Sequence, residues 1–92
     1  MENFATEHAQ ERATERLTLE LTPELAEKIV SDICLGKAIL QEQHKNSREY
    51  WIVQAGERLA NVVFDRVRLQ ILTIWSIPER EARLYHDLLK EI

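Results

Sequence analysis

The chain has little cysteine, glycine and proline, and it lacks an excess of positive charge. Its 92 residues include one cysteine, two glycines and two prolines, and its net charge is −4. The single cysteine, Cys34, excludes an intrachain disulfide and a cysteine-rich zinc site, so we expect a reducing, cytoplasmic compartment and neither metal nor cofactor. The negative charge argues against a general nucleic-acid coat, because such binding depends on neutralising phosphates. A small local basic site remains compatible with it.

Long apolar runs are also missing. No stretch approaches the roughly 20 apolar residues that span a bilayer, and residues 1–8 (MENFATEH) are too acidic and polar for a signal peptide. We therefore expect no association with a membrane. Hydrophobic residues make up 45% of the chain and charged residues 30%, which is ordinary for a globular protein, and this length predicts one domain over residues 1–92.

Three successive β-strands are predicted over residues 48–55, 59–65 and 69–76. Valine, isoleucine and aromatic residues are frequent there, and such side chains fit a pleated sheet better than a helix. The breaks between the strands are short: Gly56 can supply a positive φ in the first turn, and Asp65 can bond its own backbone in the second. Connections this short join antiparallel neighbours, so we expect a meander.

Side chains alternate along these strands, which gives the predicted sheet two unequal faces. One face is nearly all apolar and must be buried against another element. The other face mixes polar and apolar side chains, and it is a solvent-exposed surface, a surface that binds a protein partner, or a shallow binding site. The residues expected to be buried in the core are Ile29, Ile33, Val53, Val62, Phe64, Leu72 and Ile74. The apolar side chains expected on the mixed face are Val63, Ile71 and Trp75.

Two helices are predicted before the sheet, over residues 4–17 and 23–36. The first carries a seam of small residues, formed by Ala5, Ala9, Ala13 and Leu17. The second has Thr22 as N-cap, proline at its first position and Gly36 as the left-handed residue that ends it. Cys34 lies on the apolar stripe of this helix, so we expect it to be a small core residue.

A strand over residues 38–43 and a helix over residues 79–92 complete the prediction. The expected fold is α+β, with two N-terminal helices packed on a four-stranded antiparallel sheet, plus a C-terminal helix. The last helix is too short to be stable alone in water, so it must dock, and the mixed sheet face is available. Because Pro78 directly follows the last strand, docking on the same chain is difficult, and we favour a homodimer.

A column of basic side chains on the first helix is the most distinctive local pattern. His8, Arg12 and Arg16 are spaced four apart and border the small-residue seam. One interpretation is a solvated charged face, with Arg12 paired to Glu15. The other is that the three side chains converge on an anion. The pattern alone leaves both open.

The same helix resembles a known motif. The chain is similar to a widespread prokaryotic family of small domains of unknown function. The motifs that carry this similarity are Thr6-x-His8-Ala9-x-x-Arg12-x-x-x-Arg16, then Arg48-x-Tyr50, and a last strand with Thr73-Ile74-Trp75. That family has been grouped with the RelE/BrnT-like ribonuclease toxins of the barnase-like superfamily. The resemblance covers residues 4–77, as a toxin-like core, and leaves residues 78–92 as an appended helix.

The resemblance implies metal-independent cleavage of RNA in a toxin–antitoxin setting. The implied catalytic residues are His8, Arg12, Arg16 and Tyr50, and the implied substrate-binding residues are Arg48 and Thr73. Such a reaction needs a base for the 2′-hydroxyl, an acid for the 5′-oxygen and cations on the phosphorane. The alternative is a non-catalytic module on a degenerate toxin fold that binds an antitoxin-like or other protein partner.

Overall fold

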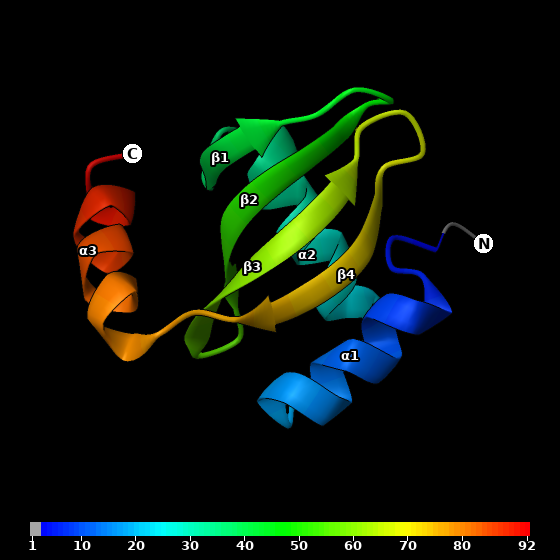
Figure 1. The fold of residues 1–92 in the computed structure, drawn as a ribbon, viewed down its shortest axis with the longest axis horizontal. Coiled ribbons are helices and arrows are strands. Elements are labelled where there is room, and N and C mark those ends of the chain that lie inside the picture. The colour runs from blue at the N-terminus through cyan, green and yellow to red at the C-terminus, as the bar shows by residue number, and fades with distance from the viewer. Residues whose placement is uncertain (1–2) are drawn as a thin grey trace.

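The computed structural model describes residues 3–92 and has an α+β fold, as expected (Figure 1). Its elements are α1 (Glu7–Leu17), α2 (Pro23–Cys34), β1 (Ile39–Gln43), β2 (Arg48–Ala55), β3 (Arg58–Asp65), β4 (Gln70–Ser76) and α3 (Glu79–Lys90). The sheet order is β1-β2-β3-β4, and every pair is antiparallel. The predicted meander is therefore confirmed, with β1 added at its edge.

The two turns of the meander form as their sequences predict. Gly56 has φ +68° between β2 and β3, a conformation that glycine adopts without steric cost. After β3, the side-chain oxygen of Asp65 accepts hydrogen bonds from the backbone N–H groups of Val67 (3.0 Å) and Arg68 (3.1 Å). These local features form the two turns that join the three long strands.

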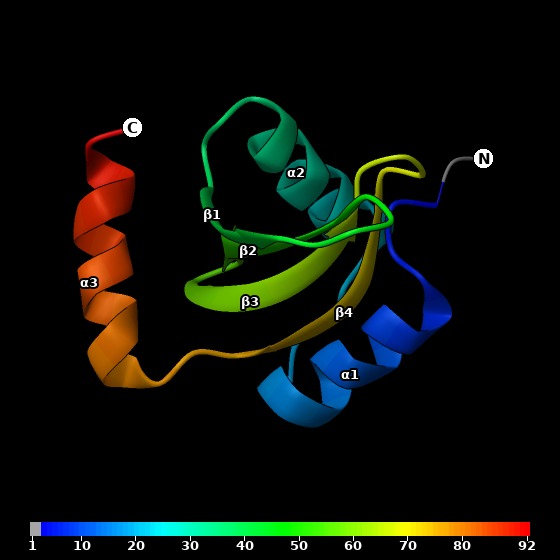
Figure 2. The same ribbon diagram turned by 45° about the horizontal axis from the view of Figure 1, so that its top comes forward.

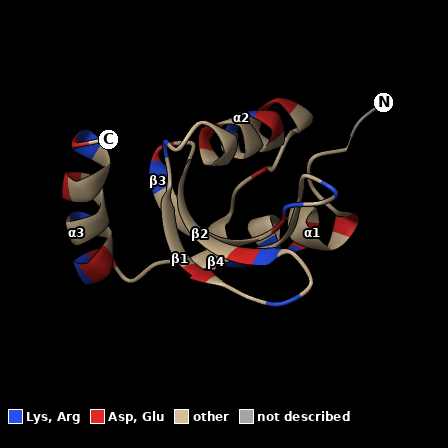
Figure 3. Ribbon diagram, turned by 90° about the horizontal axis from the view of Figure 1, so that it is seen from above, with Lys and Arg blue, Asp and Glu red and all other residues tan. Residues whose placement is uncertain are grey.

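Helix α2 covers one face of the sheet, and the opposite face has no helix over it (Figures 2 and 3). The Thr22 hydroxyl caps α2 by accepting from the Leu25 N–H at 3.1 Å, and Gly36 follows its end with φ +74°. The helix buries Ala26, Ile29, Val30 and Ile33. These side chains join those of β2, β3 and β4 in one core.

The predicted core is confirmed for six of its seven residues. Phe64, at 0% exposure, lies among Ile29, Ile33, Val53, Val62 and Ile74. Leu72 is the exception, because it is only half-buried.

A bulge in β4 explains the position of Leu72. Val63 pairs with Thr73 but Phe64 pairs with Ile71, so Leu72 is the extra residue between them. The extra residue reverses the alternation, and Ile71, expected on the mixed face, is instead fully buried in the core.

The N-terminal helix begins later than predicted, at Glu7. Ala5 makes an isolated parallel bridge with Ile71, and the two backbone bonds run from Thr6 N to Ile71 O (3.0 Å) and from Ile71 N to Phe4 O (2.8 Å). Residues 4–6 therefore extend the sheet beyond β4. The Thr6 hydroxyl then caps α1 by accepting from the Ala9 N–H at 3.1 Å.

Cys34 is exposed, contrary to the expectation of a core position. In the last turn of α2 the core-facing position belongs to Ile33, at 2% exposure. Because successive residues are about 100° apart around a helix, Cys34 is turned away from the sheet. Its sulfur lies 3.8 Å from a guanidinium nitrogen of Arg66.

Helix α3 stands beside the sheet and covers neither face (Figures 1 and 2). None of its residues, all of which are described, is buried. Its polar contact with the sheet is a hydrogen bond of 3.2 Å from the Gln41 amide to the Tyr85 hydroxyl. Ala82, Tyr85 and Leu89 of α3 are half-buried, and α3 meets the sheet at the end where Leu59 lies. The homodimer stays a prediction.

Candidate functional site

The basic column of α1 lies along β4, the last strand of the sheet. Thr6 and Arg16 donate from their side chains to the backbone carbonyls of Leu72 (3.2 Å) and Ile74 (3.3 Å). These carbonyls lie on the outer side of β4, where no further long strand pairs with them. Two residues of the helix motif thus donate hydrogen bonds to backbone carbonyls at the open edge of the sheet.

The other two residues of the column do not converge on a cleft. Arg12 forms an ion pair of 2.6 Å with Glu15, and the His8 side chain is exposed. The Arg12–Glu15 pair fits the first of the two interpretations of this column, and the catalytic roles of its three residues stay predictions.

The remaining three predicted site residues share the uncovered side of the sheet, here called the open face. Arg48 and Tyr50 belong to β2, and Tyr50 pairs with Val63, which pairs in turn with Thr73. Two strand spacings, roughly 10 Å, separate β2 from β4, and α1 lies at the far side of β4. The six predicted residues therefore form two separate groups.

A row of aromatic rings crosses the open face. The ring centroids of His44 and Tyr50 are 4.6 Å apart, with an angle of 36° between the ring planes. The ring centroids of Tyr50 and Trp75 are 6.1 Å apart, with an angle of 77° between the ring planes. The second geometry is edge-to-face, which the quadrupoles of aromatic rings favour. We call His44, Tyr50 and Trp75 the aromatic row.

A hollow of about 480 Å³ opens at the His44 end of the aromatic row. It is lined by His44, Lys45, Asn46, Arg48 and Tyr50. The turn that builds it contains two consecutive left-handed residues, with φ values of 68° and 62°, and the His44 N–H closes it by donating to the Arg48 carbonyl at 2.8 Å. Two cations and an imidazole therefore face one hollow.

A carboxylate accompanies the imidazole. The Glu42 Oε2 atom lies 3.3 Å from Nε2 of His44. A carboxylate at this distance orients an imidazole ring by accepting a hydrogen bond from it. The site therefore contains a hydrogen-bond acceptor, a group that can carry a proton, a cation and a phenol. These are supplied in turn by Glu42, His44, Arg48 and Tyr50.

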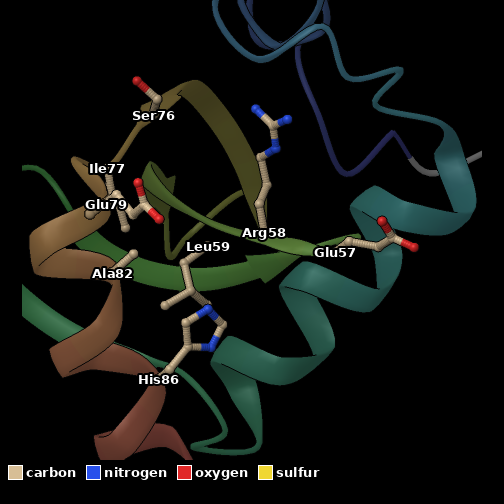
Figure 4. A pocket seen from close by; sticks show the side chains of 8 residues that line it. All are labelled: Glu57, Arg58, Leu59, Ser76, Ile77, Glu79, Ala82 and His86. Carbon is tan, nitrogen blue, oxygen red and sulfur yellow. The ribbon is translucent and has the colours of Figure 1, made fainter.

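A second hollow of about 550 Å³ separates α3 from the rim of the sheet (Figure 4). Its lining includes Leu59, Ala82 and His86, whose side chains lie close to one another. Figure 4 shows the Glu57 and Arg58 side chains extending away from His86. Because its charged groups diverge, this hollow offers no set of groups that could act on one substrate atom.

Glu49 is a buried charged residue that the sequence reasoning missed. On the α2 side of β2 its carboxylate accepts from Arg66 (2.8 Å) and from the Trp51 indole (2.9 Å). Burial by itself raises the pKa of Glu49, but the hydrogen bonds from Arg66 and Trp51 outweigh it and hold the pKa below the ordinary value of 4.5. The same carboxylate raises the pKa of Arg66. The pair ties the β3–β4 turn to β2.

Replacement of Glu49 is expected to make stability less sensitive to acid. A carboxyl whose pKa is lowered by folding stabilises the fold above its unfolded pKa, and that contribution is lost as pH falls through the folded pKa. Glu49→Gln should therefore cost roughly 1–2 kcal/mol at pH 7, because Arg66 is partly exposed and water screens its charge. The difference from wild type should shrink below pH 4.5.

Urea denaturation of both proteins between neutral and acidic pH measures this difference, with Glu57→Gln on an exposed turn as the control. A cost that is the same at every pH would contradict the role of the Glu49 charge.

His44 and Glu42 are candidate site residues that the sequence analysis did not single out. The pairing of Glu42 with Tyr50 puts Glu42 on the open face, but alternation cannot be counted through the turn that precedes β2, and a histidine in a polar turn resembles an ordinary solvated residue. Asn61, which pairs with Trp75 in the sheet, also carries no sequence signal. Among residues 3–92, its Oδ1 is the one buried side-chain nitrogen or oxygen atom without a hydrogen-bond partner.

Comparisons with known proteins return no family model, no curated protein and no solved structure that matches the chain. Within residues 3–92, no helix has the length and apolar character needed to cross a bilayer. The same residues contain no group of three or more histidine, cysteine or acidic side chains placed to hold a metal ion.

Proposed function

We propose that the open face binds single-stranded RNA and cleaves it by metal-independent acid–base chemistry at its His44 end. The observation that carries the proposal is the aromatic row next to the cationic hollow. Sheet faces with exposed aromatic rings recognise single-stranded RNA by stacking on splayed bases, and adjacent cations hold the phosphates. The resemblance to ribonuclease toxins points to the same substrate.

Each step of the reaction has a candidate group in the hollow. His44 accepts the proton of the 2′-hydroxyl while the 2′-oxygen bonds to phosphorus, and Glu42 stabilises the resulting imidazolium. Arg48 holds the oxygens of the phosphorane by paired hydrogen bonds. Tyr50 donates a proton to the 5′-oxygen as its bond to phosphorus breaks, which leaves a 2′,3′-cyclic phosphate.

Thr73 and Trp75 extend the site along β4. Trp75 stacks a base next to the scissile phosphate, since its ring adjoins Tyr50. Thr73 lies two positions before Trp75, on the same side of the strand, and donates to the backbone of the bound RNA.

Tryptophan fluorescence separates RNA binding from general association. A short single-stranded RNA with EDTA present should quench Trp75, which is half-buried on the open face, whereas Trp51 is buried on the α2 side. Trp75→Phe should abolish the quenching, and the matched Trp51→Phe variant should retain it. Quenching retained in Trp75→Phe, or equal quenching by double-stranded RNA, would contradict binding at the aromatic row.

One observation favours the alternative of a non-catalytic binding module. Thr6, Arg12 and Arg16 all have structural contacts, with the edge of β4 or with Glu15, so the helix motif is accounted for without catalysis. Analysis of the RNA ends after incubation with the protein in EDTA, together with the quenching assay, distinguishes the two functions. Formation of cyclic-phosphate ends supports the nuclease, and RNA binding without cleavage, or no binding at high protein concentration, supports the module.

A further inference from the structure

Helix α3 carries an apolar row that nothing covers. Leu84, Leu88 and Ile92 are spaced four apart and are 65%, 49% and 61% exposed. They lie on one side of the helix, while Tyr85 and Leu89, on the adjoining side, are half-buried. A helix of 12 residues is marginal in water without tertiary packing, so the exposed row needs a partner.

A row of charges borders the apolar row, and its signs are ordered along the helix. Arg80 and Arg83 stand in the first half, and Asp87 and Glu91 stand in the second half and at the C-cap. This order is the reverse of what the helix dipole favours for these four positions, which is negative charge at the start and positive charge at the end. Elsewhere on the helix the charges follow the dipole, with Glu79 and Glu81 in the first turn and Lys90 in the last, and Arg83 also lies 3.8 Å from Glu79. The reversed order is therefore confined to the row that borders the apolar side chains.

A second helix running in the opposite direction accounts for both rows. We propose that α3 pairs with α3 of a second copy of this chain in an antiparallel, two-fold arrangement. Leu84 then meets Leu88 of the other copy, and the basic half of each charged row faces the acidic half of the other. In an antiparallel pair each flank faces the same flank of the partner, so the two-fold axis generates every ion pair twice. In a parallel pair the charged row of each helix would instead face the other flank of the partner, which carries Tyr85 and Leu89 and offers no ion pair.

The size of the surface sets the strength of the dimer. Two helices of 12 residues are each about 18 Å long, and their contact lies below the roughly 1,200 Å² of a standard interface. We expect a dissociation constant of about 100 µM. Self-association does not depend on the RNA-binding function proposed above, because it uses α3 and leaves the aromatic row uncovered.

Charge reversal on the full chain tests the antiparallel pair. Sedimentation equilibrium of the wild type between about 10 µM and about 1 mM should show a monomer–dimer equilibrium. The variant Arg80→Glu/Arg83→Glu makes the whole row negative and should raise the dissociation constant roughly tenfold, since several exposed ion pairs are lost. The variant Asp87→Arg/Glu91→Arg makes the row positive and should do the same.

An equimolar mixture of the two variants provides the decisive measurement. The all-negative and all-positive rows should restore a dimer in the mixture, and circular dichroism of each variant alone verifies that the fold is intact. A wild type that stays monomeric at about 1 mM overturns the proposal, as does a wild-type dissociation constant in either variant. A dimer that is lost on Trp75→Lys but survives both charge reversals would place the partner helix on the open face instead, and would also overturn it.

Discussion

His44→Ala is expected to lower the rate of RNA cleavage by about 10²- to 10⁴-fold, the usual contribution of a positioned acid–base group. His44 is the described histidine whose ring adjoins Tyr50 and whose side chain shares a hollow with Arg48. Single-turnover cleavage of a fluorescent single-stranded RNA in EDTA measures the rate. RNA binding should weaken much less, because the Trp75 ring remains.

His8→Ala is the matched control for this prediction. His8 is also an exposed histidine near arginines, but it lies on α1, beyond β4 from the hollow. Its replacement should leave the cleavage rate within about twofold of wild type, as expected for a surface change away from the reacting atoms. Loss of cleavage in His8→Ala together with full activity in His44→Ala would move the catalytic centre to α1 and refute the assignment made here.

Phe64→Ala is expected to cost roughly 3–5 kcal/mol of unfolding free energy, as for other buried aromatic residues. Phe64 is fully buried in the centre of the core, and the Arg66 guanidinium lies 5.1 Å from its ring centroid. Truncation leaves a cavity between the sheet and α2 and removes this cation–π contact. The total free energy of unfolding of a small domain is about 5–15 kcal/mol, so the variant should be close to unfolding at 37 °C.

Urea denaturation at 25 °C measures the cost. The control is Val67→Ala in the turn after β3, where 75% exposure predicts a change within about 0.5 kcal/mol. Equal midpoints for Phe64→Ala and wild type would show that the ring contributes nothing to the core.

The fold was predictable where local chemistry determines it. Gly56 and Asp65 each specify a turn by their own backbone preferences, and Thr22 and Gly36 mark the two ends of α2. The β4 bulge was not predictable, because nothing in Gln70–Ser76 distinguishes a regular strand from a bulged one. The choice between Ile71 and Leu72 for the core is made by the pairing with β3, which is a tertiary effect.

The candidate site was predictable only in part. Strand alternation correctly puts Arg48, Tyr50 and Thr73 on one face, because side-chain direction in a strand follows from the count along the chain. Helical periodicity shows that His8 and Arg12 share a column, but it says nothing about where that column lies relative to the sheet. The position of the column relative to the sheet depends on the bridge between Ala5 and Ile71, and no local sequence pattern predicts this bridge.

The bridge between the N-terminus and β4 also bears on the order of events during synthesis. Thr6 and Leu72, which it brings together, are 66 residues apart in the chain. Contacts of such long range are costly in loop-closure entropy and form late, after the local hairpins have reduced the search. Helix α1 therefore leaves the ribosome before the strands of this sheet but can dock only after β4 has emerged. The segment of this fold that is translated earliest is among the last to become native.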